Sequence, residues 1–352
     1  MSAAALQNRP ELQELLESAV VVRLPMLTRF RGHTSREAVL FSGPAGWGEF
    51  APFPEYQPPE TQHWLASAIE AAWSGLGAPL RRSLPVNATV PAVPPEKVSE
   101  ILDRYGDSGT LDAVQAVKIK VAEPGQTLDD DVARVREVAR QMPTAGIRVD
   151  ANGAWSLSEA VTALEQIGAA AEGRLDYAEQ PVAGIEPLAQ LREALERNGI
   201  GVRIAADEAV RKAEDPLRVA RLGAADLIVV KVPPLGGVSR ALRIVEEAGL
   251  PAVVSSALDT SVGLAAGVAL AARLPELPYA CGLGTVTLFC DDVVPQPMLP
   301  VSGRLRVPVN DKGHIAAPVP NPQKLAALRV TGERELWWHQ RIREAYSHRI
   351  YP

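Results

Sequence analysis

Residues 114–152 read VQAVKIKVAEPGQTLDDDVARVREVARQMPTAGIRVDAN and contain one complete strand–helix–strand unit. Both ends are short apolar runs that finish in charged or polar side chains, while residues 128–141 carry the apolar spacing of an amphipathic helix. Two strands joined by such a helix run parallel, because the helix returns the chain to the same end of the sheet. The unit therefore predicts an α/β fold built on a parallel sheet.

The same unit recurs at intervals of roughly 30 residues from about residue 88 onward. Strands are predicted at 86–93, 114–121, 147–152, 176–181, 203–207, 226–232, 252–256 and 279–283. Amphipathic helices are predicted between them at 96–105, 128–141, 157–167, 187–198, 216–222, 238–248 and 261–274. Eight strands alternating with helices are typical of a closed (β/α)8 barrel of the TIM type. An open doubly wound sheet is the alternative, but the glycine-rich phosphate turn that it needs does not follow the first strand.

Residues 1–87 follow a different pattern, which predicts an α+β capping domain. Strand-like runs at 20–24, 37–42 and 46–51 precede a helical pattern at 61–75, and the charged loop 29–36 is interpreted as a lid over the barrel mouth. Residues 88–306 are assigned to the barrel. Residues 307–352, with helical patterns at 322–328 and 333–346, are expected to pack on the cap or on the barrel exterior.

Charge and composition narrow the class of partner. The chain has 36 basic and 42 acidic residues, a formal net charge of -6, without blocks of like charge, which argues against nucleic acid and an anionic membrane surface. Cys281 and Cys290 are too few for a disulfide framework, and the N-terminus lacks the pattern of a signal peptide. The most apolar stretch, 261–274, is shorter than the ~20 residues of a membrane span. We expect a cytoplasmic protein that acts on a small molecule, as a monomer or a homo-oligomer.

Catalytic groups of a TIM-type barrel lie where a strand ends and the following loop begins. Lys118 and Lys120 close the second predicted strand, and because they are two residues apart they share one face. The next four strands also end in charged residues, in the order Asp150, Glu179, Asp207 and Lys231. These six side chains are therefore expected to meet at the barrel mouth.

Three carboxylates that lie close together repel one another unless a cation neutralises them. Asp150, Glu179 and Asp207 supply oxygen ligands without histidine or cysteine, which favours Mg²⁺ over Zn²⁺, with Mn²⁺ as a substitute. A divalent ion bound to a substrate carboxylate stabilises the negative charge that develops when a neighbouring C–H proton leaves. The sequence therefore predicts a metal site for chemistry next to a carboxylate.

The lysines supply the base for this chemistry. A lysine base must be neutral, and a second ammonium group and a metal ion nearby lower its pKa. Lys118 and the metal are expected to do this to Lys120, while Lys231 on the sixth strand approaches the substrate from the opposite face.

Five motifs lie in order along the chain, namely Lys118-Ile-Lys120, Asp150-Ala-Asn152, Glu179-Gln-Pro, Ala-Asp207-Glu208 and Lys231-Val-Pro-Pro-Leu-Gly-Gly. Together with Gly46-Trp-Gly-Glu49, this set resembles the muconate-lactonizing subgroup of the enolase superfamily. The resemblance implies a (β/α)8 barrel with an α+β cap, and Mg²⁺ bound by Asp150, Glu179 and Asp207. It assigns acid–base chemistry to Lys120 and Lys231. Since strand alternation lets one of Asp207 and Glu208 point inward, the resemblance selects Asp207 and leaves Glu208 to orient the ligands.

Within that subgroup, the loop Ser255-Ser256-Ala-Leu-Asp-Thr-Ser261 and the run Gly282-Leu-Gly284-Thr285 resemble the dehydratases of menaquinone biosynthesis. The resemblance implies a Mg²⁺-dependent syn-dehydration of 2-succinyl-6-hydroxy-2,4-cyclohexadiene-1-carboxylate to 2-succinylbenzoate through an enediolate. Lys120 would remove the proton alpha to the carboxylate and return it to the departing hydroxyl, while Lys231 stabilises the enediolate. Substrate contacts are expected from Asn152, Ser255, Ser256 and Gly284.

Other activities of the subgroup stay open. Racemisation of N-succinyl or N-acyl amino acids would use both lysines for proton transfer, so the role of Lys231 in proton transfer is open too. Dipeptide epimerisation is disfavoured, because the Asp-x-Asp typical of those epimerases is absent from 281–284, and muconate cycloisomerisation is a third option. A non-enzymatic barrel scaffold is disfavoured, because every ligand carboxylate and lysine is retained.

Overall fold

A parallel sheet at the centre of the molecule carries the strand ends discussed above. The computed structural model describes residues 9–30, 32–106, 111–211 and 215–348, and within these ranges the sheet has seven strands, in the order β11-β10-β9-β8-β7-β6-β5. The strands are β5 Ala88–Val90, β6 Ala116–Lys120, β7 Gly146–Asp150, β8 Leu175–Glu179, β9 Ile204–Ala206, β10 Leu227–Val230 and β11 Ala252–Val254. All neighbouring pairs are parallel, as predicted from the strand–helix rhythm.

The strand predicted at 279–283 is wrong, although its residues still close the ring. Cys281 forms a parallel bridge to Val86 beside β5, and Gly282 forms one to Ser255 beside β11. Proline before this segment and glycine within it disfavour a longer strand. Two bridges of this kind join the first and last strands, so the sheet closes as a TIM-type barrel.

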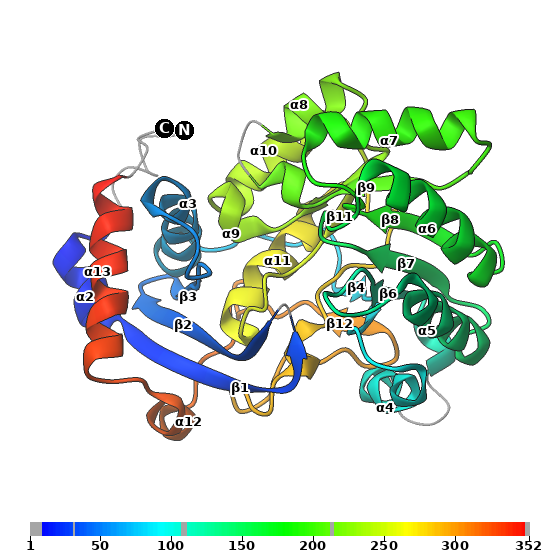
Figure 1. The fold of residues 1–352 in the computed structure, drawn as a ribbon. Helices are drawn as coiled ribbons and strands as arrows, with labels where there is room; N and C mark the ends of the chain where they lie inside the picture. The colour runs from blue at the N-terminus through cyan, green and yellow to red at the C-terminus, as the bar shows by residue number, and fades with distance from the viewer. Residues whose placement is uncertain (1–8, 31, 107–110, 212–214, 349–352) are drawn as a thin grey trace.

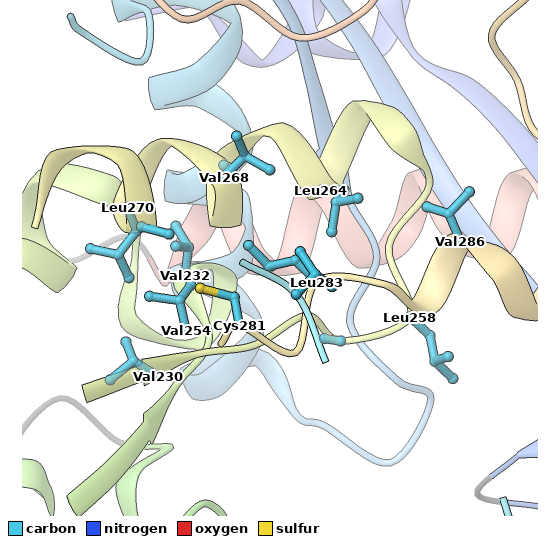
Figure 2. Close-up of a cluster of buried hydrophobic side chains, with 14 of the residues drawn as sticks. Val230, Val232, Val254, Leu258, Leu264, Val268, Leu270, Cys281, Leu283 and Val286 are labelled. Carbon is cyan, nitrogen blue, oxygen red and sulfur yellow. The ribbon is translucent and has the colours of Figure 1, made fainter. Parts of the chain in front are cut away.

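Buried apolar side chains hold this closing segment in place. Figure 2 shows Cys281 and Leu283 beneath α11, Ser261–Arg273, among side chains that include Val254 and Val268. Every residue of α11 except Arg273 is buried, which explains the apolar composition of this stretch.

Helices cover the outside of the sheet (Figure 1). They are α4 Val98–Leu102, α5 Leu128–Gln141, α6 Leu157–Ala170, α7 Ile185–Arg197, α8 Asp215–Arg221, α10 Val238–Ala248 and α11. The predicted helix at 96–105 is broken into α4 and two flanking 3₁₀ turns, Pro95–Lys97 and Asp103–Tyr105. The predictions also lacked the short turns η5 Glu208–Val210, α9 Val232–Leu235 and η6 Thr285–Leu288. Each follows a strand end or the closing segment, where the chain turns away from the barrel mouth.

An antiparallel sheet forms the N-terminal region on the other side of the molecule (Figure 1). Its strands are β1 Val20–Phe30, β2 His33–Gly43 and β3 Gly46–Phe50, and α2 Leu12–Ser18, α3 Pro58–Ile69 and the π-helical turn η1 Glu70–Ser74 surround it. β4 Ser83–Pro85 pairs with β12 Arg304–Arg306 and ties the end of this region to residues beyond the barrel.

The loop predicted at 29–36 is wrong, because most of it is strand. β1 continues to Phe30 and β2 begins at His33, with Pro25 paired to Ser35. Arg31 lies outside the described residues. Backbone pairing therefore extends further than the apolar pattern, which ended at residue 24. The interpretation of these residues as a lid stays a prediction.

The C-terminal helices lie against the N-terminal region (Figure 1). α13, Glu333–Ser347, contacts α3 and α2, and α12, Pro322–Leu328, contacts β1. Trp338 of α13 is buried, with its ring edge-on to Phe50 at 6.0 Å between centroids. None of the helices in the described part of the chain is long and apolar enough to cross a bilayer.

Candidate active site

Strand register brings the predicted site residues together at one edge of the sheet. Lys120 of β6 is the register partner of Asp150 of β7, and Asp150 is the partner of Glu179 of β8. Asp207 and Lys231 directly follow β9 and β10. All of these side chains are buried, and the three carboxylate residues are at most 1% exposed.

Each carboxylate is in contact with a lysine. Lys118 Nζ lies 3.1 Å from Asp150 Oδ2 and 3.0 Å from Glu179 Oε1, so its ammonium group lies between two carboxylates. Lys120 Nζ lies 2.7 Å from Asp150 Oδ2, and Lys231 Nζ pairs with both oxygens of Asp207. In this arrangement of the described residues, with a lysine in contact with each carboxylate, no three His, Cys, Asp or Glu side chains lie close enough together to hold a metal ion. The lysines therefore neutralise the carboxylates here.

The pKa shifts of Glu179 and Lys118 show that burial opposes the charged form of each group. Burial and the negative charge of Asp150 raise the pKa of Glu179 to about 7. Burial by itself would lower the pKa of Lys118, but the charges of Glu179 and Asp150 outweigh it and raise that pKa above its usual value. Lys118 therefore retains its proton between the two carboxylates.

A cavity at this edge of the sheet joins the lysines to two other parts of the chain. Its lining residues are Phe53, Thr89, Lys118, Lys120, Asp150, Lys231, Ser255, Ser256, Ala257, Leu258, Gly282 and Thr285. Phe53 comes from the N-terminal region, whereas Ser255 to Leu258 follow β11. The cavity therefore lies between the barrel mouth and the cap.

The predicted substrate contacts divide into two groups. Ser255 and Ser256 line the cavity, where Ser256 Oγ lies 2.7 Å from Thr285 Oγ1 and donates to Gly282 O at 3.0 Å. Gly284 does not line the cavity, because it packs behind it, where a Cβ atom would lie 3.0 Å from the Tyr105 ring.

Asn152 contacts Lys120 rather than the cavity. Its Oδ1 accepts a hydrogen bond from Lys120 Nζ, and its Nδ2 donates to Glu208 Oε1 at 3.2 Å. Asn152 has a φ of +49°, in the left-handed region that asparagine tolerates better than most residues. Asp207, which directly follows β9, is buried, while Glu208 begins the turn η5 and is half-buried, so Asp207 rather than Glu208 faces the interior.

Several functional-looking residues were missed by the sequence reasoning. Phe53 lies four residues after the Gly46-Trp-Gly-Glu49 motif, and Thr89 is the register partner of Lys118, so both had a local signal. Arg36 is buried and donates to the carbonyls of Ala51 and Leu258, a contact that spans 222 residues and has no local signature.

Comparisons with known proteins agree with this architecture. Residues 21–72 match the family model of enolase N-terminal domain-like proteins, and residues 96–314 match that of enolase C-terminal domain-like proteins. A muconate lactonizing enzyme from Pseudomonas fluorescens has a similar fold, with a TM-score of 0.73 at 20% identity over 89% of this chain and 98% of that one. 2-Chloromuconate cycloisomerase from Rhodococcus opacus gives a TM-score of 0.72 at 24% identity, with the same coverage of both chains. These structures show the shared fold.

Relatives by sequence are much closer. An o-succinylbenzoate synthase from Mycolicibacterium smegmatis is 52% identical over 333 residues, which cover 95% of this chain and 96% of the relative. Proteins of the same name from Mycobacterium marinum and Mycobacterium tuberculosis are 51% and 48% identical, over at least 95% of each chain. The family resemblance inferred from the motifs is confirmed. The chain belongs to the enolase superfamily and, within it, to the o-succinylbenzoate synthase family of lyases.

Proposed function

We propose that the chain catalyses the syn-dehydration of 2-succinyl-6-hydroxy-2,4-cyclohexadiene-1-carboxylate to 2-succinylbenzoate, a step of menaquinone biosynthesis. The identity to o-succinylbenzoate synthases over nearly the whole chain supports this reaction. The main structural support for this reaction is one cavity lined by both Lys120 and Lys231, which come from different strand ends. Buried carboxylates contact both lysines.

Three features support the binding of a divalent metal ion, which we propose is Mg²⁺, with Mn²⁺ as a substitute. Asp150, Glu179 and Asp207 supply oxygen donors from adjacent strand ends, and all three are nearly inaccessible to solvent. Burial and, after it, the charge of Asp150 raise the pKa of Glu179, and a bound cation would favour its ionised form. When bound, the ion supplies positive charge to the substrate carboxylate as negative charge develops on it.

We assign the proton transfers to Lys120. In its neutral form it removes the proton alpha to the carboxylate, and the electron pair of that C–H bond moves toward the carboxylate carbon. The C–O bond to the hydroxyl then breaks, and the same ammonium group returns the proton, so that water leaves from the same face. Lys231 stays protonated beside Asp207 and stabilises the delocalised charge. Lys118 keeps the positive charge between Asp150 and Glu179.

The substrate contacts follow from the cavity lining. The Ser255 and Ser256 hydroxyl groups are proposed to bind the succinyl carboxylate, because they line the same cavity as the lysines. Asn152 is proposed to orient Lys120, with Glu208 as its support. Gly284 acts through packing rather than contact, since a side chain there would meet Tyr105.

The wider context is also part of the proposal. We propose a capping domain at 1–87, a catalytic barrel at 88–306, and a C-terminal segment at 307–352 that packs on the cap. A cytoplasmic location is supported by two free thiols in a family that acts on a small molecule.

A panel of substrates tests the reaction. Steady-state kcat/KM is measured for the cyclohexadiene carboxylate, for N-succinyl amino acids and for dipeptides. We expect the kcat/KM of the cyclohexadiene carboxylate to exceed the others by about 100-fold or more, because kcat/KM reports transition-state binding and the site is proposed to fit this substrate. Faster turnover of an N-succinyl amino acid would contradict the assignment.

Removal of divalent ions tests the metal proposal. After dialysis against a chelator, activity is expected to fall to background and to return with added Mg²⁺ or Mn²⁺. Calorimetric titration of the metal-free protein with Mn²⁺ should give binding in the wild type and much weaker binding in Asp207→Asn. Full activity in a preparation shown to be metal-free would refute the metal site.

A further inference from the structure

Arg211 joins the barrel mouth to the cap. It directly follows η5 at the end of β9, and its guanidinium is largely buried. Nη1 donates to Tyr56 Oη at 2.6 Å, while Nη2 pairs with Glu208 and lies 3.6 Å from Asp207 Oδ2. A planar guanidinium can make these contacts together because its donors diverge in a fixed fork. Arg211 therefore contacts a proposed metal ligand, its neighbour and a cap residue.

On the cap side, Tyr56 belongs to a segment that is held firmly. Its ring lies 6.2 Å from that of Phe53 and 6.0 Å from that of Trp64, measured between centroids. Arg341 of α13 donates to the carbonyls of Phe53, Pro54 and Tyr56, each at 3.1 Å. The C-terminal helix thus fixes the backbone that presents the Tyr56 hydroxyl to Arg211.

On the site side, hydrogen bonds lead from Arg211 to Lys120. Glu208 Oε1, which pairs with Arg211, also accepts from Asn152 Nδ2 at 3.2 Å. Asn152 Oδ1 accepts from Lys120 Nζ. A flipped Asn152 amide would turn an amino group toward the ammonium and the oxygen toward the carboxylate, so Glu208 selects the orientation that binds Lys120. Arg211 in turn holds the carboxylate of Glu208 in place.

We infer that Arg211 is a positioning residue that orients Lys120 through Glu208 and Asn152, and that Tyr56 sets Arg211 according to the position of the cap. This inference rests on the proposed function, in which Lys120 transfers the proton. In this arrangement Lys120 is correctly oriented while Tyr56 of the cap contacts Arg211. Loss of the Tyr56 contact leaves Lys120 less well oriented. Arg211 itself does not line the cavity, so its effect belongs to kcat rather than to substrate binding.

The test compares Arg211→Met, Arg211→Lys, Tyr56→Phe and the Tyr56→Phe/Arg211→Met pair with the wild type. Arg218→Met is the matched control, because Arg218 lies in α8 nearby and pairs with Glu186 at the surface. We expect Arg211→Met to lower kcat by about 100-fold with KM changed less than about threefold, and Tyr56→Phe to lower kcat by about fivefold. Arg211→Lys should recover part of the lost kcat, since lysine keeps the positive charge but lacks the divergent donors of the guanidinium.

Two further readouts separate positioning from general support of the fold. With substrate deuterated at the carbon alpha to the carboxylate, the primary isotope effect on kcat should rise in Arg211→Met, because proton removal becomes more rate-limiting. Tyr56→Phe should lower kcat little further when combined with Arg211→Met, because Tyr56 acts on Lys120 only through Arg211. A raised KM with unchanged kcat and an unchanged isotope effect would overturn the inference. Losses of kcat that add in the double variant, and that are accompanied only by a lower Tm, would also overturn it. Should Arg211→Met fail to fold, Tyr56→Phe and Arg211→Lys decide the question by the same readouts.

Failure of the proposed function gives a different result. A wild type that does not turn over the cyclohexadiene carboxylate would contradict the function. The positioning inference is then judged by the same variant-to-wild-type ratios on whichever substrate of the panel loses its alpha proton.

Discussion

At the scale of single residues, the site is a set of buried charges in mutual contact. A buried carboxylate without a partner costs several kcal/mol, so Asp150, Glu179 and Asp207 each need the lysine that they contact. The lysines therefore have two tasks, since Lys120 and Lys231 also line the cavity. Loss of a lysine has a chemical consequence and an electrostatic one, and the two can be separated where a second lysine remains.

Lys120→Ala separates the chemical consequence from the electrostatic one, because Asp150 keeps its contact with Lys118 at 3.1 Å. We expect kcat to fall by about 10³-fold or more through loss of the base, while the fold is retained. Steady-state kinetics and a thermal melt followed by circular dichroism measure the two effects. Lys97→Ala, which removes an exposed partner of Glu100, is the control and should leave both unchanged. Residual activity within tenfold of the wild type would exclude Lys120 as the base.

At the scale of elements, two barrel helices were predicted residue for residue, and a local signal marks one end of each. α5 and α10 begin and end at the predicted residues. α5 starts with a capping box in which the Thr127 side chain accepts from the backbone of Asp130, and α10 ends at Gly249 in a left-handed conformation. Such caps lie within a few residues of the helix and are visible in the sequence.

The contact between β3 and α3 depends on close backbone packing. A Cβ atom at Gly48 would lie 2.1 Å from the carbonyl oxygen of Ala68, whereas a Cβ atom at Gly168 in α6 would meet nothing within 4 Å. Gly48→Ala is expected to destabilise the protein by about 3 kcal/mol, because two backbones must separate. Gly168→Ala should stabilise it by about 0.5 kcal/mol through helix propensity. Urea unfolding measures both, and a similar midpoint for the two variants would contradict this account of the interface.

Glu49 of β3 is expected to make the stability of the protein depend on pH. It accepts from Thr260 N at 3.2 Å at the start of α11, and burial together with the charge of Asp259 raises its pKa to about 8. Between about pH 5 and pH 8 this carboxyl is protonated when folded and ionised when unfolded, so the free energy of unfolding falls as pH rises.

Glu49→Gln is neutral at every pH and is expected to flatten that fall. Urea unfolding at about pH 5, 6, 7 and 8 gives the slope, which thermodynamic linkage limits to about 1.4 kcal/mol per pH unit for one proton. Glu172→Gln, at an exposed position, is the control and should keep the slope of the wild type. Equal slopes in the wild type and Glu49→Gln would contradict the prediction.

At the scale of the whole molecule, the barrel depends on contacts that close the ring. Arg148 of β7 is 2% exposed and donates to Ala280 O at 2.7 Å and to Asn87 Oδ1 at 3.2 Å. Its guanidinium also lies 5.0 Å from the centre of the Tyr177 ring. One side chain thus links the third strand to the segments on both sides of the closure.

Arg148→Met should therefore destabilise the protein by about 3 kcal/mol, because two buried acceptors lose their donor. The midpoint of urea unfolding measures this loss. Arg140→Met removes an arginine whose side chain is 69% exposed and should change stability by less than about 0.5 kcal/mol. An equal, small effect of both substitutions would show that closure does not depend on Arg148.

The alternation of strands and helices, the charged residues at the strand ends and the family were all determined by the sequence itself. These features depend on periodicity, caps and short motifs, which involve residues close together in the chain. The cavity wall contributed by Phe53, the closure at Cys281 and Gly282, and the contact of Tyr56 with Arg211 were decided by the tertiary structure. They join residues far apart in the chain, and local patterns do not specify which distant surfaces meet. That choice depends on how the whole core packs, so the charged residues at the strand ends were predictable one by one, but their assembly with the cap was not.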